Sequence, residues 1–435
     1  MAEYGEPLSE RELEILQLVA TGVTNKEVAH RLGISVNTVK VHLRNIFAKL
    51  GAESRTEATM IAVQKGWVVI PQAEAPPPQA VEAAPEPPLP LRNRVVLLVA
   101  ALLAIAGGVL SWPRPSPASA PAGPLPLGGG GGEGQRVGPE EGSQWTERAQ
   151  MPTRRAWLGL AAYAGRLYAI GGEGPDGVTG AVEIYNPSTD TWGRGTAKPT
   201  PVAYVGAAAL GDRIFVPGGC MEGGEPLDVV EVYRPAADAW EEAFPLPRPL
   251  CAYALAVYEG RLYLFGGTDG ETYLVSTYVY LPEEDRWEER APMPQPRALA
   301  AAAALEGRIY VVGGYRAGRE LTTCAVYEPE KDTWSVCAPL TMARGGLGLI
   351  ALGGQLYAIG GGGWGGYLGF SERYTPAEDR WTAAETPLTG SWRGAGTALL
   401  DLVAYAVGGY GDDYLSLTLA FEPLPFRIFI PATEG

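Results

Sequence analysis

A repeat of 47 to 48 residues is the feature that most constrains the fold of the C-terminal two-thirds of this chain. Gly-Gly pairs recur at this spacing, and each pair ends a short strand-like run such as GRLYAIGG. The six pairs stand at residues 171–172, 218–219, 266–267, 313–314, 360–361 and 408–409. Self-similarity at a fixed period of this length indicates one supersecondary unit repeated side by side. We therefore expect an all-β array of six units.

Aromatic residues keep register with the Gly-Gly pairs. A Tyr follows each of the first five pairs, and a Trp comes seven residues after each Tyr, across a turn-forming string such as NPSTDT. These residues are Tyr185 and Trp192, Tyr233 and Trp240, Tyr280 and Trp287, Tyr327 and Trp334, and Tyr374 and Trp381. The pattern resembles the Kelch repeat over about 290 residues. The resemblance implies a six-bladed Kelch β-propeller at residues 144–435, with four strands in each blade.

The two ends of the repeat array predict how the ring closes. Trp145 lies 47 residues before Trp192 without preceding strands of its own, while the sixth repeat lacks a Trp. The strand around Trp145 is therefore expected to complete the sixth blade. The C-terminal segment 426–430 competes for the same position, and the sequence does not decide between the two.

Residues 1–70 have a helical pattern with a turn at Gly33. Ser9 and Glu12 form a capping box that opens the first helix. A later helix presents an apolar stripe at helical spacing, formed by Val39, Leu43, Ile46 and Leu50. Residues 26–55 carry six basic side chains against two acidic ones, whereas residues 144–435 carry 22 basic and 35 acidic ones. Only the N-terminal segment suits nucleic acid, because an acidic surface repels phosphates.

The string TNKEVAHRLGISVNTVKVHLRNIFAKLG resembles the DNA-binding motif of the LuxR/GerE family almost position by position. The resemblance implies an all-α helix-turn-helix domain that enters the major groove, usually as a dimer. In that family the positions of Lys40, Val41 and Arg44 reach base edges, and those of Thr38 and Lys26 lie near phosphates. The expected DNA-binding residues are therefore Lys40, Val41, Arg44, Thr38 and Lys26, with Asn37 on the same outer face. Such regulators normally carry a receiver or small-molecule domain before this motif, so here any signal is expected to come from the propeller.

Between the two folded parts, composition predicts two linkers and a membrane span. Residues 71–93 are rich in Pro, Ala and Glu, and residues 113–143 in Pro and Gly, as expected of linkers. Residues 94–112 contain the uncharged run VVLLVAALLAIAGGVLSW, which as a helix would be about 27 Å long. We therefore expect one transmembrane helix, with a buried core helix as the alternative. Arginines before the run favour a cytoplasmic N-terminus and an extracytoplasmic propeller. Together with the LuxR/GerE resemblance, we expect a single-pass protein of a bacterial cell membrane.

Arginines precede the inner strand of several repeats and would converge on one face of the propeller if the blades are equivalent. The set comprises Arg155, Arg248, Arg297, Arg344 and Arg393. Either each Arg ties its loop to neighbouring carbonyl groups, or the set binds an anionic or sugar-like ligand. The only histidines of the chain are His30 and His42, so the propeller lacks imidazole ligands and imidazole general bases. We expect no cofactor, no metal and no catalytic residue.

All four cysteines of the chain lie in the propeller. Cys324 is three residues before Tyr327 and Cys337 is three residues after Trp334, so the two face each other across one hairpin. A cross-strand disulfide and two packed free thiols are both compatible with this spacing. For Cys220 and Cys251 the sequence suggests at most a shared face.

Taken together, these features predict a membrane-tethered transcriptional regulator rather than an enzyme. Its N-terminal domain would bind DNA, and its propeller would sense or dock an extracytoplasmic ligand or protein. The alternatives are a cell-surface Kelch protein that serves adhesion or carbohydrate binding, and a carbohydrate-active surface enzyme.

Overall fold

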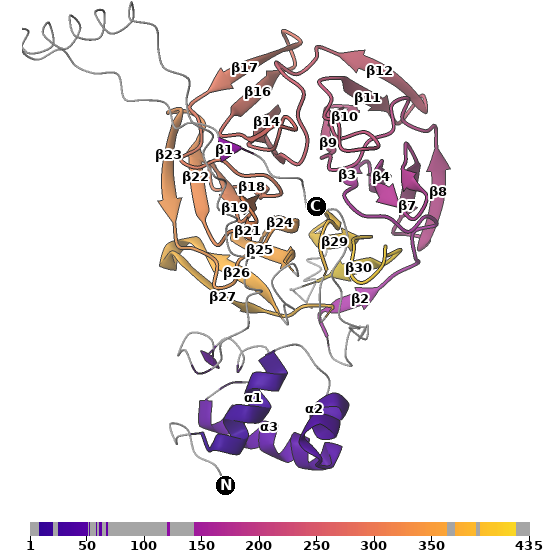
Figure 1. Cartoon of the computed structure of the whole chain (residues 1–435). Coiled ribbons are helices and arrows are strands. Elements are labelled where there is room, and N and C mark those ends of the chain that lie inside the picture. The colour runs from indigo at the N-terminus through magenta and orange to yellow at the C-terminus, as the bar shows by residue number, and fades with distance from the viewer. Residues whose placement is uncertain are drawn as a thin grey trace, which may run out of the picture. The chain divides into compact units, whose positions relative to one another are not determined.

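The computed structural model describes residues 8–20, 25–50, 52, 58, 61–62, 67, 120–121, 143–362, 370–388 and 392–422. Two folded parts stand out in Figure 1, a helical domain near the N-terminus and a ring of β-sheets. Each is described by itself. The predicted linker at 71–93 and most of the one at 113–143 lie outside the described residues.

The transmembrane helix in the predicted fold class is wrong. Within the described ranges, no helix combines the length and the apolar character that a membrane crossing demands. The longest one, α3 (Val36–Leu50), has 15 residues, whereas the hydrocarbon core of a bilayer requires about 20. An uncharged run satisfies the composition of a span, but composition alone does not establish a helix. The segment 94–112 itself lies outside the described residues.

Within the described residues, the helices of the N-terminal domain with established bounds are α1 (Glu10–Ala20), α2 (Asn25–Leu32) and α3. The predicted capping box is present, because the Ser9 backbone N–H donates to Glu12 Oε2 (2.8 Å) and the Glu12 N–H donates to Ser9 Oγ (3.3 Å). Gly33 makes the turn between α2 and α3 at φ +64°, a conformation that favours glycine. The three helices share one apolar core, which contains Ile15, Leu16, Val19, Val28, Ala29, Val39, Leu43, Ile46 and Leu50.

Six antiparallel four-stranded sheets, here called blades 1 to 6, form the ring seen in Figure 1. Blade 1 consists of β3 (Gly159–Tyr163), β4 (Arg166–Ile170), β7 (Val182–Asn186) and β8 (Thr191–Gly195). Blade 2 consists of β9 (Ala208–Leu210), β10 (Arg213–Pro217), β11 (Val230–Arg234) and β12 (Ala239–Ala243). Blade 3 consists of β13 (Ala254–Tyr258), β14 (Arg261–Phe265), β16 (Thr277–Leu281) and β17 (Arg286–Arg290).

The second half of the ring repeats this order. Blade 4 consists of β18 (Ala301–Leu305), β19 (Arg308–Val312), β22 (Cys324–Glu328) and β23 (Thr333–Cys337). Blade 5 consists of β24 (Leu347–Leu352), β25 (Gln355–Gly360), β26 (Ser371–Thr375) and β27 (Arg380–Ala384), with the 3-10 turn η1 (Pro376–Glu378) before β27. Blade 6 consists of β28 (Gly396–Leu400), β29 (Val403–Val407), β30 (Thr418–Phe421) and β2 (Trp145–Glu147). Short two-residue strands lie outside the blades: β1 (Ala120–Pro121) with β15 (Thr272–Tyr273), β5 (Glu173–Gly174) with β6 (Gly177–Val178), and β20 (Tyr315–Arg316) with β21 (Arg319–Glu320).

The ring closes in blade 6 through the strand around Trp145. β2 pairs antiparallel with β30, and Trp145 lies opposite Phe421. Their rings are 4.8 Å apart. Of the two candidates for the outer strand of the sixth blade, the N-terminal one therefore occupies the position, while segment 426–430 lies outside the described residues.

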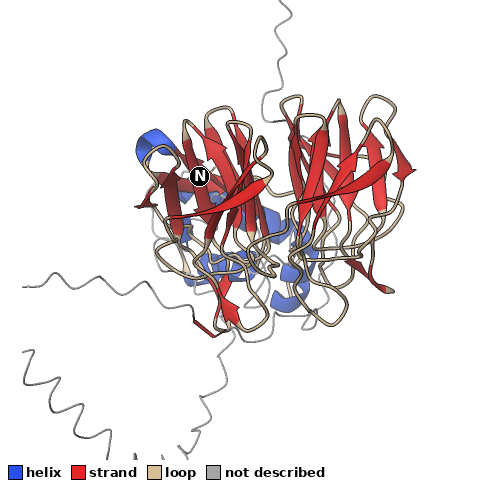
Figure 2. Cartoon of the chain, turned by 90° about the horizontal axis from the view of Figure 1, so that it is seen from above, coloured by secondary structure: helices blue, strands red, loops and turns tan. Residues whose placement is uncertain are grey.

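The Gly-Gly pairs lie where each blade meets the next one. At Gly313 a side chain would begin 2.5 Å from the carbonyl oxygen of Arg344, and the Gly314 N–H donates to that same oxygen (2.7 Å). The equivalent donors in the other blades are Gly172, Gly219, Gly267, Gly361 and Gly409. Figure 2 shows the ring edge-on, with loops at both ends of the strands. We call the end that carries these contacts the Gly-Gly face.

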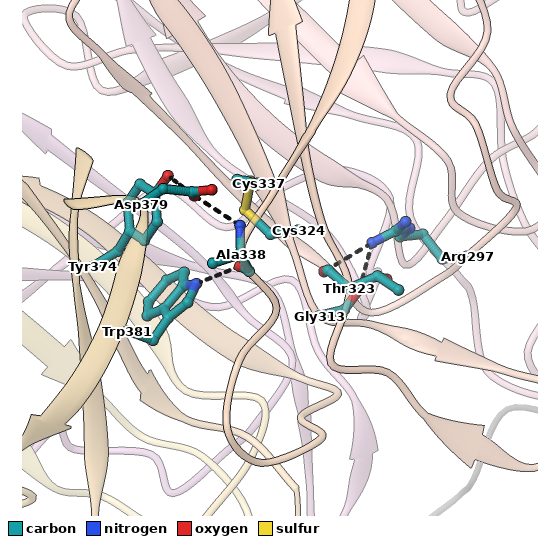
Figure 3. The surroundings of a disulfide bond; sticks show 9 residues. All are labelled: Arg297, Gly313, Thr323, Cys324, Cys337, Ala338, Tyr374, Asp379 and Trp381. Atoms are coloured by element: carbon teal, nitrogen blue, oxygen red, sulfur yellow. Dashed lines mark hydrogen bonds between the residues drawn. A yellow bond between two sulfur atoms is a disulfide. The ribbon is translucent and has the colours of Figure 1, made fainter. Parts of the chain in front are cut away.

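At the outer side of the ring, a Tyr, an Asp and a Trp of one blade hold the preceding blade. In Figure 3 the Tyr374 hydroxyl donates to Asp379 Oδ1 (2.6 Å), which also accepts the Ala338 N–H (2.8 Å). Trp381 Nε1 donates to the carbonyl oxygen of Ala338 (2.9 Å). The Trp contact recurs at Trp192, Trp240, Trp287 and Trp334, and at Trp145 with Glu385. The recurring Tyr and Trp thus lie between neighbouring blades and join them, and the Asp five residues after each Tyr is the partner that sequence reasoning missed.

Candidate functional site

The first candidate site is the outer face of α3. Val39, Leu43 and Ile46 point into the core of the domain and are at most 5% exposed. The residues on the other side of the helix are exposed: Thr38, Lys40, Val41 and Arg44. Val41 is 54% exposed. One helix face therefore presents cationic groups, a hydroxyl and an apolar side chain together.

Hydrogen bonds and ion pairs hold α3 in place. Ser35 Oγ accepts the Thr38 N–H (3.0 Å) and caps the N-terminus of the helix. At the other end, Lys49 Nζ binds Glu12 Oε2 (2.9 Å) on α1. Burial raises the pKa of Glu12, but hydrogen bonds from Ser9 and Lys49 outweigh it and hold the pKa below its usual value. Contacts at both ends therefore hold α3 in place, and they do not involve the side chains of Lys40, Val41 and Arg44.

Two of the predicted DNA-binding residues have side chains outside the described part of the structure. Lys26 lies in the first turn of α2, and Asn37 lies in the first turn of α3. The backbone positions alone are therefore established. The assignment of all six residues to DNA stays a prediction.

The second candidate site is the Gly-Gly face of the propeller. Arg155, Arg297 and Arg344 occupy equivalent positions in blades 1, 4 and 5, since the carbonyl oxygen of each accepts a Gly-Gly amide of the preceding blade. All three side chains are at most 1% exposed. The Arg344 guanidinium donates to the carbonyl oxygens of Gly360 and Phe370, both at 2.8 Å. These contacts agree with the first interpretation, in which each Arg ties its loop to neighbouring carbonyl groups.

The two other predicted arginines are out of register with this position. Leu250 and Trp392 occupy it in blades 3 and 6, as the same amide contacts show. Arg248 is two residues early, is exposed, and pairs with Asp269 (2.9 Å). Arg393 is one residue late, buried, and lies over the ring of Tyr410 at 5.1 Å. The five arginines thus do not form one symmetric set.

Buried carboxylates are the partners that sequence reasoning overlooked. Arg155 pairs with Glu183 (2.5 Å) and Arg344 with Glu372 (3.2 Å), in both cases within one blade. In blade 2 a buried Lys198 forms the equivalent pair with Glu231. The register of the repeat could have identified these carboxylates, because each Glu lies two positions before the Tyr of its repeat.

A ring of backbone hydrogen bonds surrounds the central channel at the Gly-Gly face. One residue from each blade has a positive φ there: Trp157, Tyr204, Ala252, Leu299, Gly346 and Gly394. Five of the six donate their amide to the carbonyl oxygen of the preceding member around the ring, as in Leu299 N–H to Ala252 O and Gly346 N–H to Leu299 O, both 2.8 Å. Tyr204 is the exception, because the Val205 N–H donates to the Trp157 carbonyl oxygen in its place (3.5 Å). Positive φ at four non-glycine residues is strained and marks a segment that the surrounding structure holds in place.

Trp157 and Tyr204 cover the channel at this ring. Their rings stack at 4.8 Å with an interplanar angle of 18°. The indole lies against Gly346 and Gly394, where an added Cβ would come within 2.7 and 2.6 Å of it. The same residues and the inner strands line a cavity of about 190 Å³. Among the residues that the structure describes, no group of three or more His, Cys, Asp or Glu side chains could hold a metal ion.

The four cysteines form two pairs. Cys324 and Cys337 are directly opposite in β22 and β23 and joined, with Cα atoms 5.2 Å apart (Figure 3). Cys220 and Cys251 are joined as well, with Cα atoms 5.4 Å apart. The second pair connects blade 2 to the loop before blade 3, next to the channel ring, which the sequence did not predict.

Comparisons with known families divide the chain in the same way. A model described as "Bacterial regulatory proteins, luxR family" matches residues 6–62. Models described as "Kelch motif" and "KLHDC2/KLHL20/DRC7 Kelch-repeats domain" match residues 154–196 and 196–361. These descriptions concern a regulator and a repeat domain, and none names an enzyme class.

Curated relatives match the N-terminal segment. Transcriptional regulatory protein YdfI of Bacillus subtilis (strain 168) is 49% identical over 63 residues, which cover 14% of this chain and 30% of the relative. Response regulator protein VraR of Staphylococcus aureus (strain Mu3 / ATCC 700698) is 48% identical over 67 residues, covering 15% of this chain and 32% of the relative. This chain thus spans about a third of the length of these relatives. The protein combines a LuxR-type helix-turn-helix domain at its N-terminus with a six-bladed Kelch-repeat β-propeller.

Proposed function

We propose that this protein regulates transcription by binding DNA through α3 and by binding a ligand or a partner protein through the Gly-Gly face of its propeller. The observation that carries the proposal is the exposed face of α3, on which Lys40, Val41 and Arg44 stand together. The LuxR-type match over residues 6–62 supports the same assignment.

The chemistry of this face suits the major groove. An arginine reads guanine by two parallel hydrogen bonds, and an apolar side chain contacts the methyl group of thymine. Arg44 and Val41 are three positions apart on α3, so both reach the same side of the helix. Thr38 and Lys40 are placed to contact a phosphate or a base edge beside them. We propose in addition that two copies bind an inverted repeat, as is usual for the family that this domain resembles.

The propeller supplies the regulatory input in this proposal. The Kelch match supports a role in protein interactions. Attachment to a membrane and an extracytoplasmic propeller are proposals of the same kind. The two cysteine pairs support the extracytoplasmic location of the propeller, because disulfides persist mainly in oxidising compartments. Alkylation of cysteines in intact cells would test the location, since a propeller kept in a reducing compartment would react at all four thiols.

Selection of genomic fragments with the full chain, followed by titration at several salt concentrations, tests DNA binding. We expect Arg44→Ala to weaken binding to the selected site about 10- to 100-fold and to relax specificity at one base pair, because a base contact is worth about 1–3 kcal/mol. Arg286→Ala, which removes an exposed cation from blade 3, is the matched control and should leave binding unchanged. Equal losses in both variants would contradict a readout role for α3.

A further inference from the structure

Five polar side chains gather at the channel mouth on the Gly-Gly face, and the polar atoms of their side chains take no part in the Gly-Gly or Tyr, Asp and Trp contacts between blades. We call them the mouth cluster: Glu173, Tyr204, Glu320, Arg393 and Tyr414. They come from blades 1, 2, 4 and 6, although β-propeller blades contact only their neighbours through their strands. Their convergence therefore results from the loops and not from the repeat.

The Tyr204 hydroxyl is the first observation that points to a ligand. Tyr204 is only 6% exposed, and its hydroxyl has no hydrogen-bond partner among the described residues. An unsatisfied buried hydroxyl costs about 1–3 kcal/mol, so its retention requires an explanation. Glu173, Tyr414 and Arg393 are the charged and polar groups close enough to affect it electrostatically.

Glu320 is the second observation. Its Oε1 atom is buried and has no hydrogen-bond partner in the described part of the chain. Burial raises the pKa of Glu320 to about 7, against the lowering effects of the Gly345 amide, Arg393 and Arg344. Near neutral pH this carboxyl group is therefore able both to donate and to accept a hydrogen bond.

Arg393 links these two groups, because its charge acts on both Tyr204 and Glu320. Half-buried aromatic rings lie beside it. Tyr410 lies under the Arg393 guanidinium at 5.1 Å and packs against Tyr414 with ring centroids 5.2 Å apart. The Tyr414 hydroxyl donates to Glu173 Oε1 (2.9 Å). The site thus offers hydroxyl, carboxyl and guanidinium groups next to aromatic carbon.

We propose that the mouth cluster binds a neutral polyol, namely the terminal sugar residue of a carbohydrate. A sugar offers adjacent hydroxyl groups that both donate and accept, which is what the unpartnered oxygens of Tyr204 and Glu320 require. Its C–H groups can pack on the rings of Tyr410 and Tyr414. The cluster holds one guanidinium and two carboxyl groups, and the high pKa of Glu320 keeps part of that carboxyl group neutral near pH 7, so the cluster has no excess of positive charge to select an anion. This assignment rests on the proposed ligand-binding role of the propeller and names the class of ligand.

Saturation-transfer NMR and calorimetric titration of the full chain test the proposal. The probes are the methyl glycosides of glucose, galactose and mannose, and N-acetylglucosamine. We expect one of these probes to bind. Tyr204→Phe, which removes only the hydroxyl, and Glu320→Gln, which keeps the shape of the side chain, should each weaken that binding at least about tenfold, as expected for a lost hydrogen bond of about 1.4 kcal/mol. Tyr163→Phe, on β3 at the far end of the blade, is the matched control and should bind normally.

Melting temperatures of the three variants should not fall below that of the wild type, so that loss of binding is not loss of folding. Tetramethylammonium and acetate serve as charged probes. Binding of only a charged probe would overturn the proposal, as would sugar binding that both cluster variants leave unchanged, or no binding of any of the sugars. The titrations contain no DNA. A negative result would therefore reject sugar binding and leave the proposed DNA binding to its own test.

Discussion

At the scale of single residues, the propeller contains buried cations of two kinds. Arg344 faces a carboxylate, Glu372, whereas Arg297 donates, among the described residues, to the carbonyl oxygens of Gly313 and Thr323. The reason is one substitution between blades, because Ala325 in blade 4 stands two positions before the repeat Tyr, where blade 5 has Glu372. Burial lowers the pKa of Arg297 to about 10, and nearby Arg316 adds to this effect. The positive charge of the buried Arg therefore meets a carboxylate in blade 5 and carbonyl oxygens in blade 4.

This difference predicts unequal losses of stability. Arg344→Met leaves the Glu372 carboxylate buried without its charged partner, which costs about 3–5 kcal/mol. Arg297→Met leaves only carbonyl groups unsatisfied, so its free energy of unfolding should fall by about 1–3 kcal/mol. Urea unfolding followed by the near-ultraviolet circular dichroism of the propeller tryptophans measures both. Equal losses would show that the Glu372 pair contributes nothing beyond its hydrogen bonds.

At the scale of elements, the Gly-Gly pairs determine how closely adjacent blades approach. The first Gly of each pair combines a positive φ with a close contact to the backbone of the next blade. At Gly313 this contact is with the Arg344 carbonyl oxygen, at 2.5 Å from an added Cβ. The distance between adjacent blades is therefore set by steric contacts at these glycines as well as by the packing of aromatic side chains.

We expect Gly313→Ala to destabilise the propeller by clearly more than Gly307→Ala. Both positions have positive φ, +65° and +74°, so both variants lose about 1–2 kcal/mol for placing a side chain in the left-handed region. Only Gly313→Ala also collides with the next blade, because the nearest atom to an added Cβ at Gly307 is 3.9 Å away. Thermal unfolding of the two variants side by side measures the additional loss. Similar melting temperatures would mean that blades 4 and 5 move apart at little cost.

At the scale of the whole molecule, the ring is held shut by a strand taken from its N-terminal end. Trp145 is 2% exposed, packs against Phe421, and donates from Nε1 to the carbonyl oxygen of Glu385 (3.3 Å). Blade 6 lacks the Tyr of the other blades, since Phe421 takes its place. Blade 6 is therefore completed by the three-residue strand β2, which comes from the other end of the propeller domain.

Trp145→Ala should open this junction, at a cost of about 3–5 kcal/mol for a buried Trp. Hydrogen exchange of the full chain should then rise first in β2 and β30. Trp192→Ala, which removes the equivalent hydrogen bond in blade 1, is the control and should lower stability while β2 and β30 stay protected. Uniform exchange throughout the ring in the Trp145 variant would instead mean that the propeller unfolds as a single unit.

Much of this organisation was predictable from the sequence. The sequence predicted the six blades, the capping box at Ser9 and the opposed Cys324 and Cys337. Each follows from residue spacing within a short segment, and the structure contains each of them. Local spacing suffices here because a strand pairs with its neighbour and a helix buries every third or fourth residue. The transmembrane helix was the wrong prediction, because an apolar run reports composition and not conformation.

Only the tertiary structure decided which buried groups meet. The sequence suggested five equivalent arginines, yet Arg248 and Arg393 are out of register, and the partner of Arg344 is a carboxylate 28 residues away. It left the outer strand of blade 6 open, and it did not foresee that Tyr204 and Glu320 share one channel mouth. A repeat period determines how each blade is built, because those contacts are local. It does not determine which loop side chains converge on the axis, because that depends on distances between segments far apart in the chain.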